Sequence, residues 1–145
     1  MTISIATPAD VEDLTEAFQR LVPQLSRSNP PPGRDAVAEM LASPAISQFV
    51  ARDDGTGAIV GVSTLAVFRI PTARRAWIED VITDEAARGQ GVGEELTRAM
   101  LDRARELGCT TVDLTSRPSR EVANRLYRRV GFEWRDTNVY RFELS

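Results

Sequence analysis

Residues 77–96 read Trp-Ile-Glu-Asp-Val-Ile-Thr-Asp-Glu-Ala-Ala-Arg-Gly-Gln-Gly-Val-Gly-Glu-Glu-Leu and determine how the rest of the chain is interpreted. The run 77–82 is typical of a strand, and apolar residues then recur at helical spacing from Leu96 to Leu107. Between them, residues 88–93 contain three glycines, which let backbone N–H groups approach a ligand closely. The free N–H groups of a helix's first turn attract anions, so we expect a phosphorylated ligand here.

The spacing of these glycines separates three kinds of phosphate-binding loop. A Walker loop needs Lys-Ser/Thr after its last glycine, but Glu94 and Glu95 follow Gly93. A dinucleotide fingerprint needs its third glycine one residue later. The remaining pattern, Arg/Gln-x-x-Gly-x-Gly/Ala, is met by Arg88, Gly91 and Gly93 and resembles the pyrophosphate loop of the GNAT superfamily of acyl-CoA-dependent N-acyltransferases. The alternative is a glycine-rich turn that only joins a strand to a helix.

Length and composition predict one globular domain over residues 1–145. The chain is 42% apolar and 27% charged with a net charge of −3, which gives no electrostatic reason to expect binding to nucleic acid or an anionic membrane. No apolar run approaches the ~20 residues of a membrane helix, and the N-terminus lacks a signal-peptide pattern. Cys109 is the single cysteine, which fits a reducing cytoplasm. We expect it to be packed rather than nucleophilic.

The absence of two residue types narrows the chemistry. The chain has no histidine, which excludes Ser-His-Asp and Cys-His nucleophile systems and His-ligated zinc. It also has no lysine, since all 18 basic residues are arginine, which excludes Schiff-base chemistry. Acid–base catalysis must therefore use a carboxylate, a phenol, the thiol or water.

Periodicity and turn signals give an ordered set of elements. We expect strands at residues 2–5, 46–52, 58–68, 75–83, 111–115, 132–135 and 139–144, and helices from Thr7 to about 22, then at 35–42, 91–107 and 119–130. Pro23 should end or kink the first helix, and Ser119 should cap the last. The crossover helix predicts that strand 111–115 is parallel to its neighbour. This is an α/β chain.

A second motif lies in the last predicted helix. Residues 123–132, Ala-Asn-Arg-Leu-Tyr-Arg-Arg-Val-Gly-Phe, resemble the Ala-x-x-Leu-Tyr-x-x-x-Gly-Phe segment of the same superfamily. With both motifs in the expected element order, the resemblance covers nearly the whole chain. It implies a GNAT-like mixed, mostly antiparallel six- to seven-stranded sheet, flanked by about four helices, with strands 4 and 5 splayed.

The resemblance also implies that acetyl-CoA is the cosubstrate, with no metal. The backbone of Val81, Ile82 and Thr83 would pair with the pantetheine arm. The amides of the loop would bind the pyrophosphate, which involves Arg88, Gly89, Gln90, Gly91, Val92, Gly93 and Glu94. The family's usual Asn three residues before the motif's alanine is Arg120 here, so Arg120 or Asn124 would have to replace it.

The same resemblance implies catalytic roles for several residues. Tyr127 occupies the position of the general acid that protonates the leaving thiolate, with a purely packed tyrosine as the alternative. The Val81 N–H would stabilise the oxyanion. For the base, alternation puts Glu79 on one face with Trp77 and Val81, and Asp80 on the other. Because the tryptophan could desolvate the carboxylate and raise its pKa, Glu79 is the first choice, with Asp80 or water as alternatives.

The function implied is an N-acetyltransferase that moves an acetyl group to a primary amine of a small molecule or amino-acid-like compound, by direct attack in a ternary complex. Two alternatives stay open: a catalytically silent acyl-CoA-binding sensor or regulatory module, and a protein or peptide N-acetyltransferase. A nucleotide-binding regulatory domain is disfavoured by the loop spacing. A homodimer is common in such folds.

Overall fold

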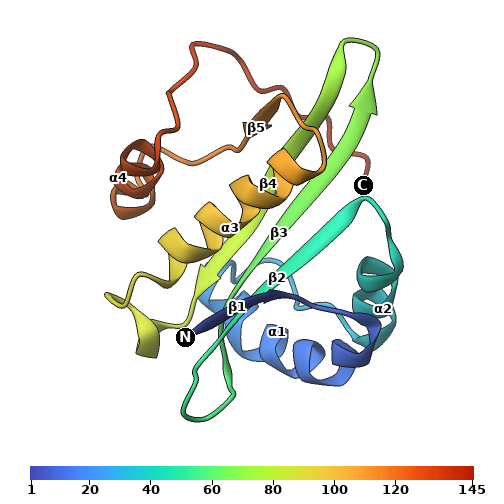
Figure 1. The fold of residues 1–145 in the computed structure, drawn as a ribbon, viewed down its shortest axis with the longest axis vertical. Coiled ribbons are helices and arrows are strands. Elements are labelled where there is room, and N and C mark those ends of the chain that lie inside the picture. Colours follow the sequence, from blue (N-terminus) through green and yellow to red (C-terminus); the bar gives the residue numbers. More distant parts are fainter. The chain divides into compact units, whose positions relative to one another are not determined.

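The structure is a computed structural model that describes residues 1–145, drawn as a ribbon in Figure 1. Its contacts divide the chain into two compact units, Met1–Thr115 and Ser116–Ser145. The first unit holds the whole sheet and the glycine-rich loop, and the second holds the tyrosine motif.

One five-stranded sheet organises the first unit, with its strands in the order β1-β2-β3-β4-β5. The three junctions from β1 to β4 are antiparallel, and β5 is parallel to β4, as the crossover helix predicted. The strands are β1 (Thr2–Ile5), β2 (Ile46–Arg52), β3 (Ile59–Ile70), β4 (Ala73–Thr83) and β5 (Thr111–Asp113).

Helices cover both faces of this sheet. The helical elements are the 3-10 turn η1 (Pro8–Asp10), α1 (Val11–Leu25), α2 (Arg34–Ala42), the 3-10 turn η2 (Glu85–Ala87) and α3 (Val92–Glu106). Gly61 of β3 faces α3, whereas the next residue, Val62, packs with Leu14, Leu21 and Val37 in the core under α1 and α2. Since successive strand residues point to opposite faces, α3 lies on one face and α1 and α2 on the other.

Helix α1 continues for two residues beyond Pro23, which lies inside its last turn. The sequence predicted that Pro23 would end or kink the helix, and the first of these two alternatives was wrong. A proline lacks the N–H that would donate to the carbonyl four residues earlier, so the helix gives up this one hydrogen bond near its end and stops two residues later, at Leu25.

Gly61 marks the closest approach between α3 and the sheet. A Cβ atom at this position would lie 2.6 Å from Val92 Cγ1 and 3.2 Å from Leu96 Cδ1. Real side chains do not approach so closely, so only glycine lets the first turn of α3 rest on β3 at this depth. The start of α3 is thereby fixed against the sheet.

A β-bulge interrupts β4 at Asp80. Glu79 pairs with Thr64 of β3 and Ile82 pairs with Val62, so Asp80 and Val81 together oppose the single residue Ser63. Asp80 has a φ of 48°, in the left-handed region that non-glycine residues seldom adopt. Because Val62 and Thr64 share a face, Glu79 shares its face with Ile82 and not with Val81. The predicted simple alternation along 77–83 was wrong beyond Glu79, because the extra residue shifts the phase of the pleat.

The second unit contains α4 (Glu121–Val130), whose N-cap is Arg120 rather than the predicted Ser119. Gly131 ends the helix with a φ of 122°, and its N–H donates to the carbonyl of Tyr127 at 3.1 Å. Residues 131–145 form no strand, so the sheet has five strands instead of the predicted six to seven. The alternating apolar residues near the C-terminus had suggested strands, but a strand also needs a neighbouring backbone to pair with, and here none does so. No helix of the chain has the length and apolar character needed to cross a membrane.

Candidate active site

The carboxyl half of β4 has one unpaired edge. β4 and β5 are paired only where Arg75–Trp77 meet Thr111–Asp113, and beyond these residues the two strands separate. The β4 residues that follow include Val81, Ile82 and Thr83, whose β3 side remains paired at Ile82 and Thr83. Their other backbone edge is thus open to an extended ligand, while the Ile82 side chain is buried in the core. An unpaired backbone edge beside a buried side chain is what we expect if Val81, Ile82 and Thr83 bind a ligand through their backbone.

The glycine-rich loop needs glycine at two of its positions. Gly89 and Gly91 have φ angles of 82° and 78°, and no atom lies within 4 Å of where a Cβ would stand. Gly91 is the N-cap of α3, and the first intrahelical bond runs from the Glu95 N–H to the Gly91 carbonyl at 3.0 Å. Helix geometry therefore leaves the amides of Val92 and Gly93 without an intrahelical acceptor. An anion at the loop would meet these amides and the positive end of the α3 dipole.

The charged side chains around the loop are paired along the surface. Glu94 forms an ion pair with Arg98 at 3.3 Å, one turn along α3, and Glu95 is exposed. Arg88 is exposed and pairs with Glu85 at 3.8 Å. The Thr97 hydroxyl donates to the Gly93 carbonyl at 2.7 Å and so ties the first turn of the helix together. The carboxylate of Glu94 is therefore directed along α3 toward Arg98.

The structure brings Trp77 and Glu79 together on one face of β4. The indole Nε1 of Trp77 donates to Glu79 Oε1 at 2.7 Å, which confirms that the two side chains are neighbours. The Glu79 side chain is nevertheless exposed, so the tryptophan orients the carboxylate rather than desolvating it. Asp80 is also exposed and lies in the bulge.

Glu79 is the outer end of a polar row across the sheet that the sequence analysis missed. Gln48, Thr64 and Glu79 occupy paired positions on β2, β3 and β4. The Thr64 hydroxyl donates to Gln48 Oε1 at 2.7 Å, and the buried Gln48 donates its amide to the Ser63 carbonyl at 3.0 Å. Since the Thr64 proton is engaged, its oxygen faces any ligand only as a hydrogen-bond acceptor. One signal was available, because Thr64 is a polar residue inside the apolar run 59–70.

Tyr127 is the main buried side chain of α4. Its ring makes an edge-to-face contact with Phe132, with centroids 5.7 Å apart and planes at 69°. Burial raises the pKa of the Tyr127 phenol, and the charge of Arg120 opposes this rise. Within residues 116–145 the Tyr127 hydroxyl forms no hydrogen bond. The Asn124 amide donates to the Arg117 carbonyl at 2.9 Å and so holds the segment before α4.

Cys109 lies partly buried after α3. Burial raises the pKa of its thiol, against the opposing charge of Arg74. A thiol with a raised pKa is a poor nucleophile near neutral pH, which agrees with the expected packing role.

The open β4 edge, the positive-φ glycine loop and the tyrosine helix all lie within a part of the chain that matches a known family. Residues 12–132 match the acetyltransferase (GNAT) family. The chain belongs to the GNAT family of acetyltransferases. The match covers most of the chain and includes both motifs, and it confirms the resemblance seen in the sequence.

Individual relatives agree with this membership. The chain is 34% identical over 119 residues to glucosamine 6-phosphate N-acetyltransferase 1 of Oryza sativa subsp. japonica, covering 77% of this chain and 72% of the rice protein. Among solved structures, a putative acetyltransferase from Agrobacterium tumefaciens str. C58 is similar with a TM-score of 0.84 and 28% identity, over 99% of this chain and all of that one. A protein described as a transcriptional regulator from Bacillus halodurans C-125 has a TM-score of 0.80 and 29% identity, over 98% and 99% of the two chains. The GNAT fold and the assignment as an acetyltransferase thus rest on sequence and structure alike.

Proposed function

We propose that this GNAT protein moves the acetyl group of acetyl-CoA to a primary amine of a small molecule or amino-acid-like compound, by direct attack in a ternary complex. The observation that carries the proposal is that three binding features follow one another along the chain. The unpaired edge of β4 leads into the Gly89–Gly91 loop, and the loop leads into the first turn of α3. An extended thioester arm suits the strand edge, and a pyrophosphate suits the helix start. The family match spans both compact units, which supports treating residues 1–145 as one domain.

The donor would be held chiefly by backbone. In this proposal Val81, Ile82 and Thr83 pair with the pantetheine arm, and the amides of residues 89–94 bind the pyrophosphate, with Arg88 at the loop entrance. Asn124 would contribute its carbonyl oxygen or its second amide proton, since one amide proton already donates to the Arg117 carbonyl. Binding through backbone explains how acidic side chains at positions 94 and 95 are compatible with an anionic ligand.

The chain's own residues would then carry the acyl transfer. The amine nitrogen, freed of its extra proton by Glu79 or by water that Glu79 orients, attacks the thioester carbonyl carbon. The Val81 N–H donates to the oxyanion of the tetrahedral intermediate. As the carbon–sulfur bond breaks, the Tyr127 phenol gives its proton to the thiolate. The raised pKa of Tyr127 keeps that proton in place until it is needed.

The polar row on the sheet favours a cationic amine as the substrate. Thr64 offers lone pairs only, and the exposed Glu79 carboxylate is a neighbouring hydrogen-bond acceptor with a negative charge. An ammonium group supplies donors and a positive charge to both. The rice relative is named for glucosamine 6-phosphate, so an amino sugar phosphate belongs first in the panel of amines tested.

The test is calorimetric titration of acetyl-CoA and of ATP into the purified chain, followed by a thiol-release screen over amines. We expect saturable acetyl-CoA binding, no competition by ATP, and thiol release with at least one amine. Glu79→Gln should lower kcat on the order of 10²-fold, the scale of general-base catalysis, while Asp80→Asn should change it little. Absence of acetyl-CoA binding would refute the proposal.

A second candidate is an acyl-CoA-binding regulatory module, favoured by the similarity to a protein described as a transcriptional regulator. This role predicts acetyl-CoA binding without thiol release on any amine. The same screen therefore decides between the two, provided that small amines, amino acids, amino sugars and peptide N-termini are all included.

A further inference from the structure

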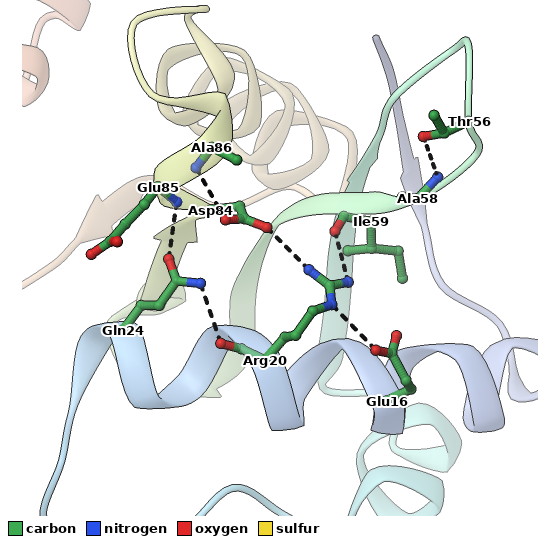
Figure 2. Close-up of polar contacts among 9 residues, drawn as sticks. All are labelled: Glu16, Arg20, Gln24, Thr56, Ala58, Ile59, Asp84, Glu85 and Ala86. Atoms are coloured by element: carbon green, nitrogen blue, oxygen red, sulfur yellow. Dashed lines mark hydrogen bonds and ion pairs between the residues drawn. The ribbon is translucent and has the colours of Figure 1, made fainter.

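One arginine of α1, Arg20, reaches the residue that follows β4. The Arg20 guanidinium donates to Asp84 Oδ2 at 3.1 Å and to the Ile59 carbonyl at 3.1 Å. It also pairs with Glu16, one turn earlier on α1, at 3.2 Å. Figure 2 shows these three contacts converging on the guanidinium from α1, β3 and the end of β4. One side chain thus ties three elements of the first unit to each other.

Asp84 divides its hydrogen bonds between this arginine and the loop. Its Oδ1 accepts the Ala86 N–H at 3.2 Å and so caps the 3-10 turn η2, while Oδ2 faces Arg20. Its backbone N–H donates to the Val60 carbonyl at 2.8 Å, and its carbonyl accepts the Ala87 N–H at 2.9 Å. The carboxylate is only 20% exposed, which strengthens its attraction to the arginine relative to a surface pair.

Gln24 makes a second contact one turn further along α1. Its Oε1 accepts the Glu85 N–H at 2.9 Å, and its Nε2 donates to the Arg20 carbonyl at 3.2 Å (Figure 2). The side-chain amide therefore joins the helix backbone to the first residue of η2. We call Arg20, Gln24, Asp84 and Glu85 the α1 clamp.

We propose that Arg20 and Gln24 are positioning residues for the acetyl-CoA loop. This inference rests on the proposed function. Gly89 and Gly91 have open space around them, so their own packing does not fix the loop. Its shape depends on its two ends: α3 seated over Gly61 on one side and the α1 clamp on the other. A loop held in its binding conformation before the ligand arrives loses less conformational entropy on binding.

The chain supplies a matched control in Arg52. This arginine also ties α1 to the sheet, with Nη1 donating to Asp13 at 2.6 Å and to the Gly57 carbonyl at 3.0 Å. Its contacts lie at the hairpin between β2 and β3, and it makes none with residues 84–94. Arg52→Gln therefore removes a similar set of α1–sheet bonds without touching the loop.

A first experiment measures the clamp without any ligand. Amide hydrogen exchange, followed by NMR, should be faster in Arg20→Gln than in the wild type at Ala86 and Ala87, and faster in Gln24→Ala at Glu85. Arg52→Gln should leave these three amides at the wild-type rate. Unchanged exchange at these amides in both clamp variants would overturn the inference, whether or not the protein binds acetyl-CoA.

A second experiment measures the consequence for binding and catalysis. Arg20→Gln should raise the Kd and the KM for acetyl-CoA on the order of tenfold while leaving kcat and the KM for the amine within about twofold. Arg20→Lys, which keeps the charge, should recover part of the loss, and Arg52→Gln should bind acetyl-CoA like the wild type. An equal loss in Arg52→Gln would show a general stability effect and contradict the proposal. Wild type that binds no acetyl-CoA would instead refute the proposed function.

Discussion

At the scale of single residues, Tyr127 offers a clear pH prediction. Its phenol pKa is raised by burial, so the protonated form persists to higher pH than in an ordinary tyrosine, whose pKa is about 10. As a general acid it should remain active as pH rises, and be lost only above the raised pKa. We therefore expect kcat to show no decline from this group below about pH 10, and Tyr127→Phe to lower kcat on the order of 10²-fold.

The pH–rate profile of kcat at saturating acetyl-CoA checks this prediction. Tyr140→Phe is the control, because Tyr140 is 89% exposed and lies outside both motifs. If Tyr127→Phe retained the wild-type kcat and profile, the ring would have only a packing role.

Asp80 gives a stability prediction of a different kind. With φ at 48°, it adopts a conformation that asparagine and glycine tolerate and β-branched residues resist. We expect Asp80→Asn to keep the free energy of unfolding within about 0.5 kcal/mol and Asp80→Val to lower it by about 1–3 kcal/mol. Urea denaturation measures both. Equal stability of the two variants would mean that the bulge relaxes when position 80 is changed.

The residue scale also shows what a sequence pattern misses. The Trp77–Glu79 contact could be predicted, because residues two apart on a strand share a face. The bulge at Asp80, which reverses the face to which later residues point, could not be predicted, because it depends on the register between β4 and β3. Thr64 was missed for the same reason, since its neighbours Gln48 and Glu79 are set by pairing between strands far apart in the sequence.

At the scale of elements, the close packing of α3 on β3 predicts that a second substitution can compensate for a destabilising one. Gly61→Ala would place a methyl group 2.6 Å from Val92 Cγ1, so the start of α3 would have to shift. We expect a loss of about 1–3 kcal/mol in the free energy of unfolding and weaker acetyl-CoA binding. Adding Val92→Ala removes the clashing atom, so the double variant should be more stable than the sum of the single effects indicates.

Denaturation of the two single variants and the double variant measures this coupling. Strict additivity would contradict the proposed contact. Gly33→Ala is a useful control, because a Cβ at Gly33 would meet nothing within 4 Å.

Most elements of the first unit were predictable within a residue or two, since their periodicity and turn signals agree. The hairpin of residues 53–57 is one example: Asp53 Oδ1 accepts the N–H groups of Gly55 and Thr56, each at 2.9 Å. The two expected C-terminal strands failed because alternation describes a pleated segment but not its partner. The expected cap at Ser119 failed because capping also depends on the backbone conformation of residue 120.

At the scale of the whole molecule, acetyl-CoA should stabilise the native chain. A ligand that binds only the folded state adds about 2.7 kcal/mol at a concentration of 100 times Kd. We expect a rise of several degrees in Tm with acetyl-CoA and none with ATP at the same concentration. Thermal unfolding at a series of ligand concentrations measures it. A similar rise with ATP would indicate general anion binding instead of recognition of the thioester arm.

The family and the fold class could be predicted from the sequence because the loop and tyrosine motifs lie in one consistent element order. The α1 clamp could not, since Arg20 and Asp84 lie 64 residues apart and neither belongs to a motif. Motif residues of a site can thus be predicted from the sequence, whereas the contacts that hold the site in place require the structure.

The bulge in β4 has a practical consequence for protein engineering. Before Asp80 the odd-numbered residues Trp77 and Glu79 share the α1 face of the sheet, and after it the even-numbered Ile82 does. Deleting a single residue at position 80 would remove the bulge and restore regular alternation while Ile82 stays opposite Val62 in the core, whereas replacing that residue would keep the bulge. A library that redesigns the α1 face of β4 should therefore vary odd-numbered positions before Asp80 and even-numbered positions after it. Alignments of related chains should be checked at this position for one-residue gaps before residues are compared.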